Sequence, residues 1–330
     1  MRRLALTLAC VLAATAARAQ EALVQPEVRP ATLVSGAAAG ARVGAIRLLG
    51  VLELHTPSIA GLRFAELSGL AWDADEKILY AISDQGGLFW LRPQLRNGRL
   101  EGLDVLKAVP LREANGKPVR WRRSDSEGLA VLNARNGQRG DTELVVSFER
   151  IPRIVRYRPD GILLGELPLP APLADAGAYQ GANKSLEAVT IHPRFGVLTA
   201  PEAPLRDSQW RDRRLFSLNG AWWGLVSEPQ SDITAIEWVD GIGLLMLERR
   251  YGVKNVYPET RLLRVRDLSQ ETGTTLRPET VAVLKSATAY QHDNFEGLTH
   301  HEGRRFFMVT DDNDAFLQRT LLVYFELLEE

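Results

Sequence analysis

The sequence predicts an all-β protein, and more narrowly a β-propeller, from three observations. Between Ala45 and Leu327 the apolar runs are short and are bounded by Gly, Pro, Asn or Asp, which is typical of strands joined by turns. No long stretch has the 3.6-residue period of an amphipathic helix. The third observation is a phrase that occurs five times, in which an acidic residue opens an apolar strand and a second strand ends at another acid.

The N-terminal residues differ in composition from the repeats. Two arginines precede an apolar run over residues 4–14, and residues 17–19 (Ala-Arg-Ala) offer a small-residue cleavage site, so we expect residues 1–19 to be a signal peptide. The paired arginines leave general secretory and twin-arginine export both open. We expect residues 20–44, rich in Ala, Gly and Pro, to be a flexible leader. Residues 45–330 then form a single propeller domain in a periplasmic or secreted protein.

Composition and charge exclude several classes of protein. The chain has 330 residues, of which 45% are hydrophobic and 25% charged, an ordinary balance for a globular domain. Cys10 is the only cysteine and lies in the signal peptide, so the mature chain has no thiol for a disulfide. The formal net charge is −1, or −4 without residues 1–19, and a nucleic-acid binder would normally be basic. No mature segment approaches the roughly 18 apolar residues of a membrane span. We expect a monomer.

The spacing of the repeat indicates blades of a propeller. The acids that open the five copies are 61, 60, 45 and 64 residues apart, near the roughly 40–50 residues of known blade repeats. A blade of about four strands needs two further strands in each copy, and Arg153–Tyr157 and residues 261–265 alternate well enough to supply them. We expect Ile46–Leu54 and residues 320–327 to pair and close the ring. Six blades, one of them degenerate, are favoured, with five as the alternative.

The repeated acids predict a site at one mouth of the propeller, because equivalent positions of successive inner strands form a ring. The acids expected in the inner ring open the five copies: Glu66, Glu127, Glu187, Asp232 and Glu296. Those of a wider ring end the second strands: Asp84, Glu149, Glu202, Glu248 and Asp311. Clustered carboxylates repel one another unless a cation neutralises them.

Carboxylate oxygens select hard cations, and a roomy site with about 6–8 oxygens favours Ca²⁺, with Mg²⁺ as the alternative. The predicted metal ligands are the five inner acids and Asp311. A second interpretation leaves the ring without an ion, each acid accepting hydrogen bonds from backbone amides between blades.

Basic residues beside the acids suggest an anionic partner. Arg150, Lys184 and Arg249 lie next to repeated acids, and such cations could hold the oxygens of a small anionic substrate such as a phosphate ester. The alternative is charge pairing with the neighbouring glutamates. There is no nucleophile elbow, P-loop, zincin or dinucleotide-binding motif.

Four motifs together resemble a known family, the phytase-like domains described as having the esterase-like activity of phytase. The motifs are Ser83-Asp84-Gln85-Gly86, Ser147-Phe148-Glu149-Arg150, Asn294-Phe295-Glu296-Gly297-Leu298 and Thr310-Asp311-Asp312-Asn313. The resemblance runs from about Ile46 to Phe325 and implies a β-propeller.

The resemblance also implies a chemistry. The better-known β-propeller phytases hold Ca²⁺ at an acidic channel mouth and hydrolyse phosphomonoesters there, and propeller lactonases and arylesterases use Ca²⁺ to polarise an ester carbonyl. By that likeness Glu127, Glu187 and Glu296 are catalytic, and Arg150, Lys184 and Arg249 bind a small anionic or ester substrate. The expected activity is Ca²⁺-dependent hydrolysis of phosphate monoesters or carboxylic esters. The alternative is a non-catalytic periplasmic propeller that binds a ligand or serves as a scaffold.

Overall fold

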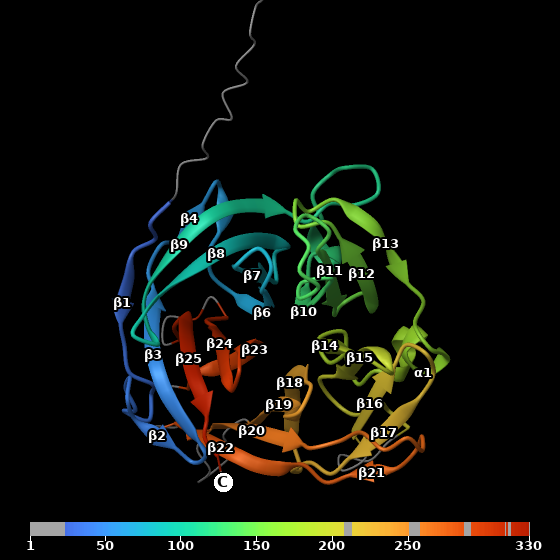
Figure 1. Cartoon of the computed structure of the whole chain (residues 1–330). Helices are drawn as coiled ribbons and strands as arrows, with labels where there is room; N and C mark the ends of the chain where they lie inside the picture. The colour runs from blue at the N-terminus through green and yellow to red at the C-terminus, as the bar shows by residue number, and fades with distance from the viewer. Residues whose placement is uncertain are drawn as a thin grey trace, which may run out of the picture.

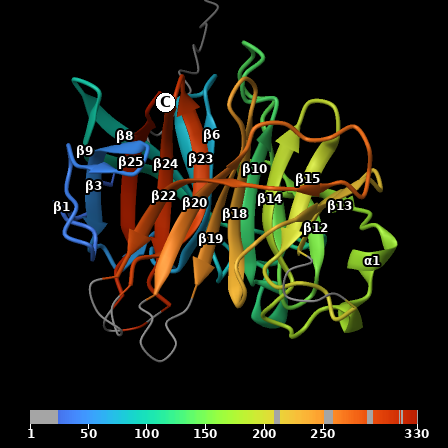
Figure 2. The ribbon, with the colours of Figure 1, turned by 90° about the horizontal axis from the view of Figure 1, so that it is seen from below.

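The computed structural model describes residues 24–207, 213–250, 258–286, 292–313, 315 and 318–329. The expected signal peptide and Cys10 lie outside these residues. Within them, five large sheets stand around one axis like the blades of a propeller (Figure 1). Figure 2 shows the ring from the side, with the strands running across its thickness and loops forming its two ends. None of the helices in the described part of the chain is long and apolar enough to cross a membrane.

Each blade is an antiparallel meander that starts at the ring axis. The strands of each blade are given from the axis outward. The first blade consists of β6 (Leu67–Asp73), β7 (Ile78–Ser83), β8 (Gly87–Arg96) and β9 (Arg99–Pro110), and the second of β10 (Ser126–Leu132), β11 (Glu143–Phe148), β12 (Arg153–Tyr157) and β13 (Leu163–Leu167). The third consists of β14 (Leu186–His192), β15 (Gly196–Pro201), β16 (Arg213–Ser217) and β17 (Trp222–Leu225), and the fourth of β18 (Ser231–Val239), β19 (Gly243–Arg250), β20 (Glu259–Val265) and β22 (Glu279–Lys285). The fifth blade is β23 (Asn294–Glu302), β24 (Arg305–Asp311), β25 (Leu321–Leu327) and β3 (Ile46–Leu54).

Several short elements lie outside the four main strands of each blade. They are β1 (Val28–Pro30) and β2 (Arg42–Val43) beside β3, the hairpin β4 (Ser58–Ile59) and β5 (Leu62–Arg63), β21 (Thr275–Leu276) parallel to β17, the helix α1 (Ala171–Ala174), and the 3-10 turns η1 (Trp121–Arg123) and η2 (Ala176–Ala178). The strands predicted at Arg153–Tyr157 and residues 261–265 are confirmed as β12 and part of β20.

The two ends of the described chain close the ring as predicted. β25 pairs with β3 antiparallel, from Leu321 opposite Glu53 to Leu327 opposite Ile46. Figure 1 shows this junction as the blue β3 beside the red β25. The preference for six blades is wrong and the alternative of five is right for the described residues. β3 takes the outer place in a sheet that already holds β23, β24 and β25, so the terminal strands complete the fifth blade and do not build a sixth.

The described part of the expected leader lies on the outside of the fifth blade. β1 pairs antiparallel with β3, and β2 forms a hairpin with the start of the same strand. Leu33, between them, is only 2% exposed. Burial of such a side chain contributes about 1.5–3 kcal/mol, so Leu33 anchors this segment to the fifth blade, whereas Val24 bridges to Val105 of the first blade.

The core is divided among the blade interfaces. Five apolar clusters each join neighbouring blades: first with second, second with third, third with fourth, fourth with fifth, and fifth with first. Every central strand is therefore covered on both faces. This explains why β7 (Ile-Leu-Tyr-Ala-Ile-Ser), buried at every position, reads as a continuous apolar run rather than an alternating one.

The inner strands approach one another closely around the axis. A Cβ atom added at Gly69 would lie 2.6 Å from the carbonyl oxygen of Glu127, and one at Gly128 would lie 2.7 Å from that of Glu187. Hydroxyl groups bridge the same strands, as where Ser68 Oγ donates to the Ser126 carbonyl oxygen at 2.6 Å. The small residue that follows the ring position is thus a packing requirement, which accounts for the recurring Glu-Gly-Leu phrase.

Candidate functional site

The same irregularity occurs near the start of every inner strand. The pairing of each inner strand with its neighbour shifts register there, so that one or two residues bulge from the ladder. The bulged residues at equivalent positions in the five blades are Ser68, Glu127, Glu187, Thr234 and Glu296. Three of the five ring positions therefore carry glutamate, and the other two carry a hydroxyl group.

The inner ring predicted from the sequence is corrected at two positions. Glu66 and Asp232 lie two residues before Ser68 and Thr234, the residues that occupy the ring in the first and fourth blades. Their equivalent in the second blade is Asp125. Glu66 precedes β6 and still lines the cavity, whereas Asp232 does not line it and pairs with the lining residue Lys184, so both acids stay near the ring although neither belongs to it.

The outer ring is corrected at one position. Its members follow the residue opposite the bulge and are Asp84, Glu149, Glu202, Arg249 and Asp311. In the fourth blade Glu248 pairs with Ile233, and Arg249 takes the ring position. The carboxylate of Glu248 turns to other partners and accepts hydrogen bonds from Ser231 and Arg261.

The two rings line one cavity of about 360 Å³ at the end of the propeller where the inner strands begin; we call it the acidic funnel. Its lining comprises nine carboxylic acids, three cations and two amides: Glu66, Asp84, Asp125, Glu127, Glu149, Glu187, Glu202, Glu296, Asp311, Arg150, Lys184, Arg249, Asn183 and Asn313. All predicted site residues except Asp232 therefore line the same cavity, and acids outnumber bases three to one.

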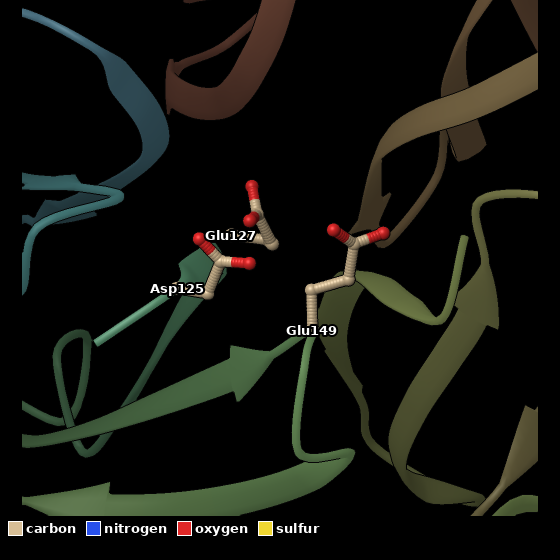
Figure 3. A group of neighbouring side chains, drawn as sticks. All are labelled: Asp125, Glu127 and Glu149. Atoms are coloured by element: carbon tan, nitrogen blue, oxygen red, sulfur yellow. The ribbon is translucent and has the colours of Figure 1, made fainter. Parts of the chain in front are cut away.

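Carboxylate oxygens converge in three overlapping groups, within each of which the ligand atoms lie within 4.8 Å of one another. The groups are Asp125, Glu127 and Glu149; Glu127, Glu187 and Glu296; and Glu149, Glu187 and Glu202. Figure 3 shows the first group, in which side chains from the start of β10 and from the residue after β11 point into the same space. Sequence reasoning missed Asp125 as a site residue. Its position two residues before Glu127 was the available signal.

Burial and mutual repulsion disfavour the ionised form of these acids. Burial raises the pKa of Glu127, and the charges of Asp84 and Glu187 raise it further. Burial and neighbouring carboxylates raise the pKa of Glu149 and of Asp311 to about 8 each. The three cations of the lining do not neutralise its nine carboxylic acids, so a bound metal cation would favour the ionised form of these acids.

Arg249 is the one strong internal counter-charge of the outer ring. Its side chain is 5% exposed and its guanidinium donates to Glu202 Oε1 at 2.8 Å, to Glu296 and to Asn294. Asn294, a further residue missed by sequence reasoning, also donates to Glu296 at 2.8 Å. These bonds hold Glu202 and Glu296 at one side of the funnel.

Lys184 continues this pairing toward the fourth blade. Its ammonium lies 2.9 Å from Glu202 and 2.8 Å from Asp232. Burial lowers the pKa of Lys184, but those two carboxylates raise it above its usual value, so the side chain stays charged. Asp232 is held from behind by the buried guanidinium of Arg213 at 3.7 Å. Asp232 thus positions Lys184 rather than facing the cavity.

Arg150 is the most exposed of the three predicted substrate-binding cations. Its side chain is 44% exposed and donates to Asp125 Oδ2 at 2.7 Å. The histidine pair of the sequence lies elsewhere: His300 and the buried His301 are near the far end of β23, where His301 packs against Trp72. Among the described residues, the funnel lining holds no imidazole.

The raised pKa values predict an unusual pH dependence for the metal-free protein. Between about pH 4.5 and pH 8 the folded state binds more protons at Glu149 and Asp311 than the unfolded state does, so the free energy of unfolding falls as pH rises through that window. We expect urea unfolding in EDTA to show a steadily lower midpoint from pH 5 to pH 9. The same titration with saturating Ca²⁺ is the control, and there the fall should disappear. A metal-free midpoint that is flat or rises with pH would contradict this account of the funnel.

The chain is similar in sequence to one protein family and similar in fold to several solved structures. A family described as phytase-like, with the esterase-like activity of phytase, matches residues 62–314. A search of curated proteins finds no match. Solved structures with a similar course of chain include PQQ-bound aldose sugar dehydrogenase from Streptomyces coelicolor (12% identity, 86% of this chain and 98% of that chain, TM-score 0.41), a gluconolactonase from Xanthomonas campestris (14%, 93% and 98%, 0.40) and the β-propeller domain of Cps50 from Myceliophteria thermophila (10%, 92% and 96%, 0.39). Because the family match spans well over half of the sequence and covers both rings of the funnel, the chain belongs to the phytase-like family.

Proposed function

We propose that the protein is an exported, Ca²⁺-dependent hydrolase of phosphate monoesters or carboxylic esters that acts at the acidic funnel. The observation that carries the proposal is the convergence of buried carboxylates in three overlapping groups at one cavity. Family membership supports an ester as the substrate class.

The donor set fits a hard divalent cation. Every side chain in the three groups is a carboxylate, and no sulfur or imidazole lines the described cavity, which disfavours Zn²⁺. Asp84 Oδ1 is buried and has no hydrogen-bond partner among the described residues. A buried acceptor left in this state costs roughly 1–3 kcal/mol, and a cation would remove that cost. The number of available oxygens favours Ca²⁺, with Mg²⁺ as the second choice.

The first carboxylate group is the best-supported holder of the ion. Lys184 and Arg249 pair with Glu202, and Arg249 also with Glu296, on the opposite side of the funnel, whereas the cation paired with the first group is the partly exposed Arg150 on Asp125. The remaining proposed ligands are Glu187 and Glu296 of the inner ring, Asp84 and Asp311 of the outer ring, and Glu66 two residues before the first ring position. When bound, the ion would supply Lewis-acid polarisation of a phosphoryl or carbonyl oxygen.

The chain's own residues have separate proposed roles. Arg150, exposed at the edge of the funnel, is placed to receive the anionic group of a substrate. Lys184, one-third exposed, could share an oxygen of that group while keeping its bond to Asp232. Glu127, Glu187 and Glu296 form the floor, and we assign to this trio the proton acceptance from the attacking water.

Hydrolysis assays test the proposal. We expect turnover of at least one of p-nitrophenyl phosphate, phytate and p-nitrophenyl acetate with Ca²⁺, and at least a 100-fold lower rate in EDTA, because nine carboxylates without an ion repel an anion and leave no electrophile. Restoring Ca²⁺ to the EDTA-treated protein is the control. Turnover that is equal in EDTA, or no turnover of any of the three, would count against the proposed function.

One observation favours a non-catalytic ligand-binding or scaffold module. Lys184 and Arg249 are already bonded to carboxylates, so two of the three predicted substrate-binding cations serve the protein's own acids. This alternative predicts saturable Ca²⁺ binding together with no hydrolysis of any ester in the same assays.

We further propose that the protein reaches the periplasm or the medium after cleavage before Gln20. Mass spectrometry of the chain recovered from the periplasm of an expressing cell measures this directly. A mass matching residues 20–330 is expected, and an intact N-terminal methionine on the recovered chain would oppose it.

A further inference from the structure

A second cavity lies at the opposite end of the ring. Its volume is about 400 Å³, within the range of sites for small organic ligands. The cavity is lined by the last residues of the inner strands and by the loop that follows β10. None of its lining residues is shared with the acidic funnel.

An apolar plug separates the two cavities. One buried residue from each inner strand lines the narrow space between them: Leu70, Leu129, Val189, Ile236 and Leu298. The space among these residues is about 10 Å³, which is room for a water-sized molecule, so an organic ligand bound in the second cavity would not pass through to the funnel.

The cavity exists because the next layer of the ring is small. Directly beyond the plug stand Ala71, Ala130, Thr190, Glu237 and Thr299, one from each blade. Two alanines and two threonines leave the axis open. Glu237 is the only charged member of this layer, and it faces the space that the small residues create.

Among the described residues, hydrogen-bond donors hold the carboxylate of Glu237. The His300 amide donates to Oε1 at 2.8 Å, and the Thr190 hydroxyl lies 3.2 Å from Oε2. That hydroxyl oxygen already accepts the Trp238 amide at 3.0 Å, so its single proton is directed to the carboxylate. Thr299 repeats the arrangement, accepting an amide at 3.1 Å and lying 3.5 Å from Glu237. Such a setting orients the carboxylate for a ligand and suits its ionised form.

Aromatic walls and a basic roof complete the cavity. Trp72 and Trp238 line it from the first and fourth blades. Arg135, on the loop after β10, reaches over the first blade to the fifth and donates to the carbonyl oxygens of His300 at 2.8 Å and His301 at 3.0 Å. The roof is thus tied to the protein across the mouth, and the charge of Arg135 opposes the rise that burial causes in the pKa of Glu237 below it.

We infer that this second cavity binds a small organic amine, with the ammonium on the Glu237 carboxylate and the apolar body against the Trp72 and Trp238 indoles. The carboxylate supplies the charge that recognises an ammonium better than a neutral group of the same shape, and the indoles supply apolar contact for the body of the ligand. The ligand site is independent of the proposed hydrolase activity.

Calorimetric titration of the mature chain tests the inference. Phenethylamine is the probe and 2-phenylethanol its neutral match, both at pH 8, since burial raises the pKa of Glu237 only to about 7. Saturating Ca²⁺ is present so that the acidic funnel does not attract the amine. We expect saturable binding of phenethylamine that is at least 10-fold tighter than that of 2-phenylethanol. Equal binding of the two probes, or no binding of the amine, would overturn the inference.

Variants locate the bound amine. Glu237→Gln should weaken phenethylamine binding at least 10-fold, whereas Glu127→Gln, in the funnel, should leave it unchanged. The reverse pattern would place the amine in the funnel and overturn the inference. Should Glu237→Gln fail to fold, Arg135→Met decides: removing a nearby cation should tighten amine binding several-fold, and unchanged or weaker binding would contradict the site.

Discussion

Calcium is expected to raise the melting temperature of the mature protein by about 5 °C or more, and EDTA to reverse the rise. A ligand at 100 times its dissociation constant stabilises the folded state by about 2.7 kcal/mol, and 1 kcal/mol shifts the melting temperature by roughly 2–4 °C for chains of 150–250 residues. The physical reason is the funnel itself, where nine carboxylic acids face three cations. Differential scanning calorimetry at pH 7.5, with 1 mM CaCl₂ or 1 mM EDTA, measures the shift.

Mg²⁺ is the matched comparison in this experiment. A roomy set of carboxylates accommodates the larger ion, while Mg²⁺ demands near-ideal octahedral geometry and gives up water reluctantly. We expect its shift to be smaller than that of Ca²⁺ at equal concentration. A melting temperature that neither ion changes would remove the metal from the proposed function and leave the rings as purely structural acids.

Glu127→Gln is expected to abolish the Ca²⁺ shift and to lower kcat/KM at least 100-fold, yet to leave the metal-free protein as stable as the original or more so. Glu127 belongs to two of the three carboxylate groups, so its loss removes a ligand from both. Without metal, the same change removes a buried carboxyl group whose ionised form is disfavoured by burial and by the charges of Asp84 and Glu187. Opposite signs with and without Ca²⁺ are the signature of a ligand, because a merely structural glutamate would destabilise both states.

Two further variants serve as controls for Glu127→Gln. Glu101→Gln changes an acid whose side chain is 48% exposed and lies outside the funnel, and it should alter neither stability nor the Ca²⁺ shift. Glu248→Gln tests the corrected ring: Glu248 bonds to Ser231 and Arg261, so the variant should lower the melting temperature equally with and without Ca²⁺. Loss of the Ca²⁺ shift in Glu248→Gln, or its survival in Glu127→Gln, would contradict the assignment of ring positions.

Local pattern was sufficient for the architecture. Short apolar runs bounded by turn residues indicated an all-β fold, and the spacing of five similar strand pairs indicated blades. Pairing between Ile46–Leu54 and the C-terminal strand was also predictable, since a closed ring leaves no sheet edge unpaired. Glu127, Glu187 and Glu296 were placed on one ring because each precedes a small residue and an apolar one in the same phrase.

Only the tertiary structure decided the blade count and the membership of the rings. Terminal strands can form a separate sheet or complete an existing one, depending on which strands they pair with. Here β3 pairs with β25 and so completes the fifth blade. Glu66 and Asp232 were misplaced by two residues because a strand has a period of two, so a two-residue shift preserves the pattern of faces and only the bulge fixes the register. The exchange of Glu248 for Arg249 depends likewise on cross-strand pairing. The sequence determined that acids gather at one end of this propeller; the pairing of its strands decided which of them face the cavity and which hold the others in place.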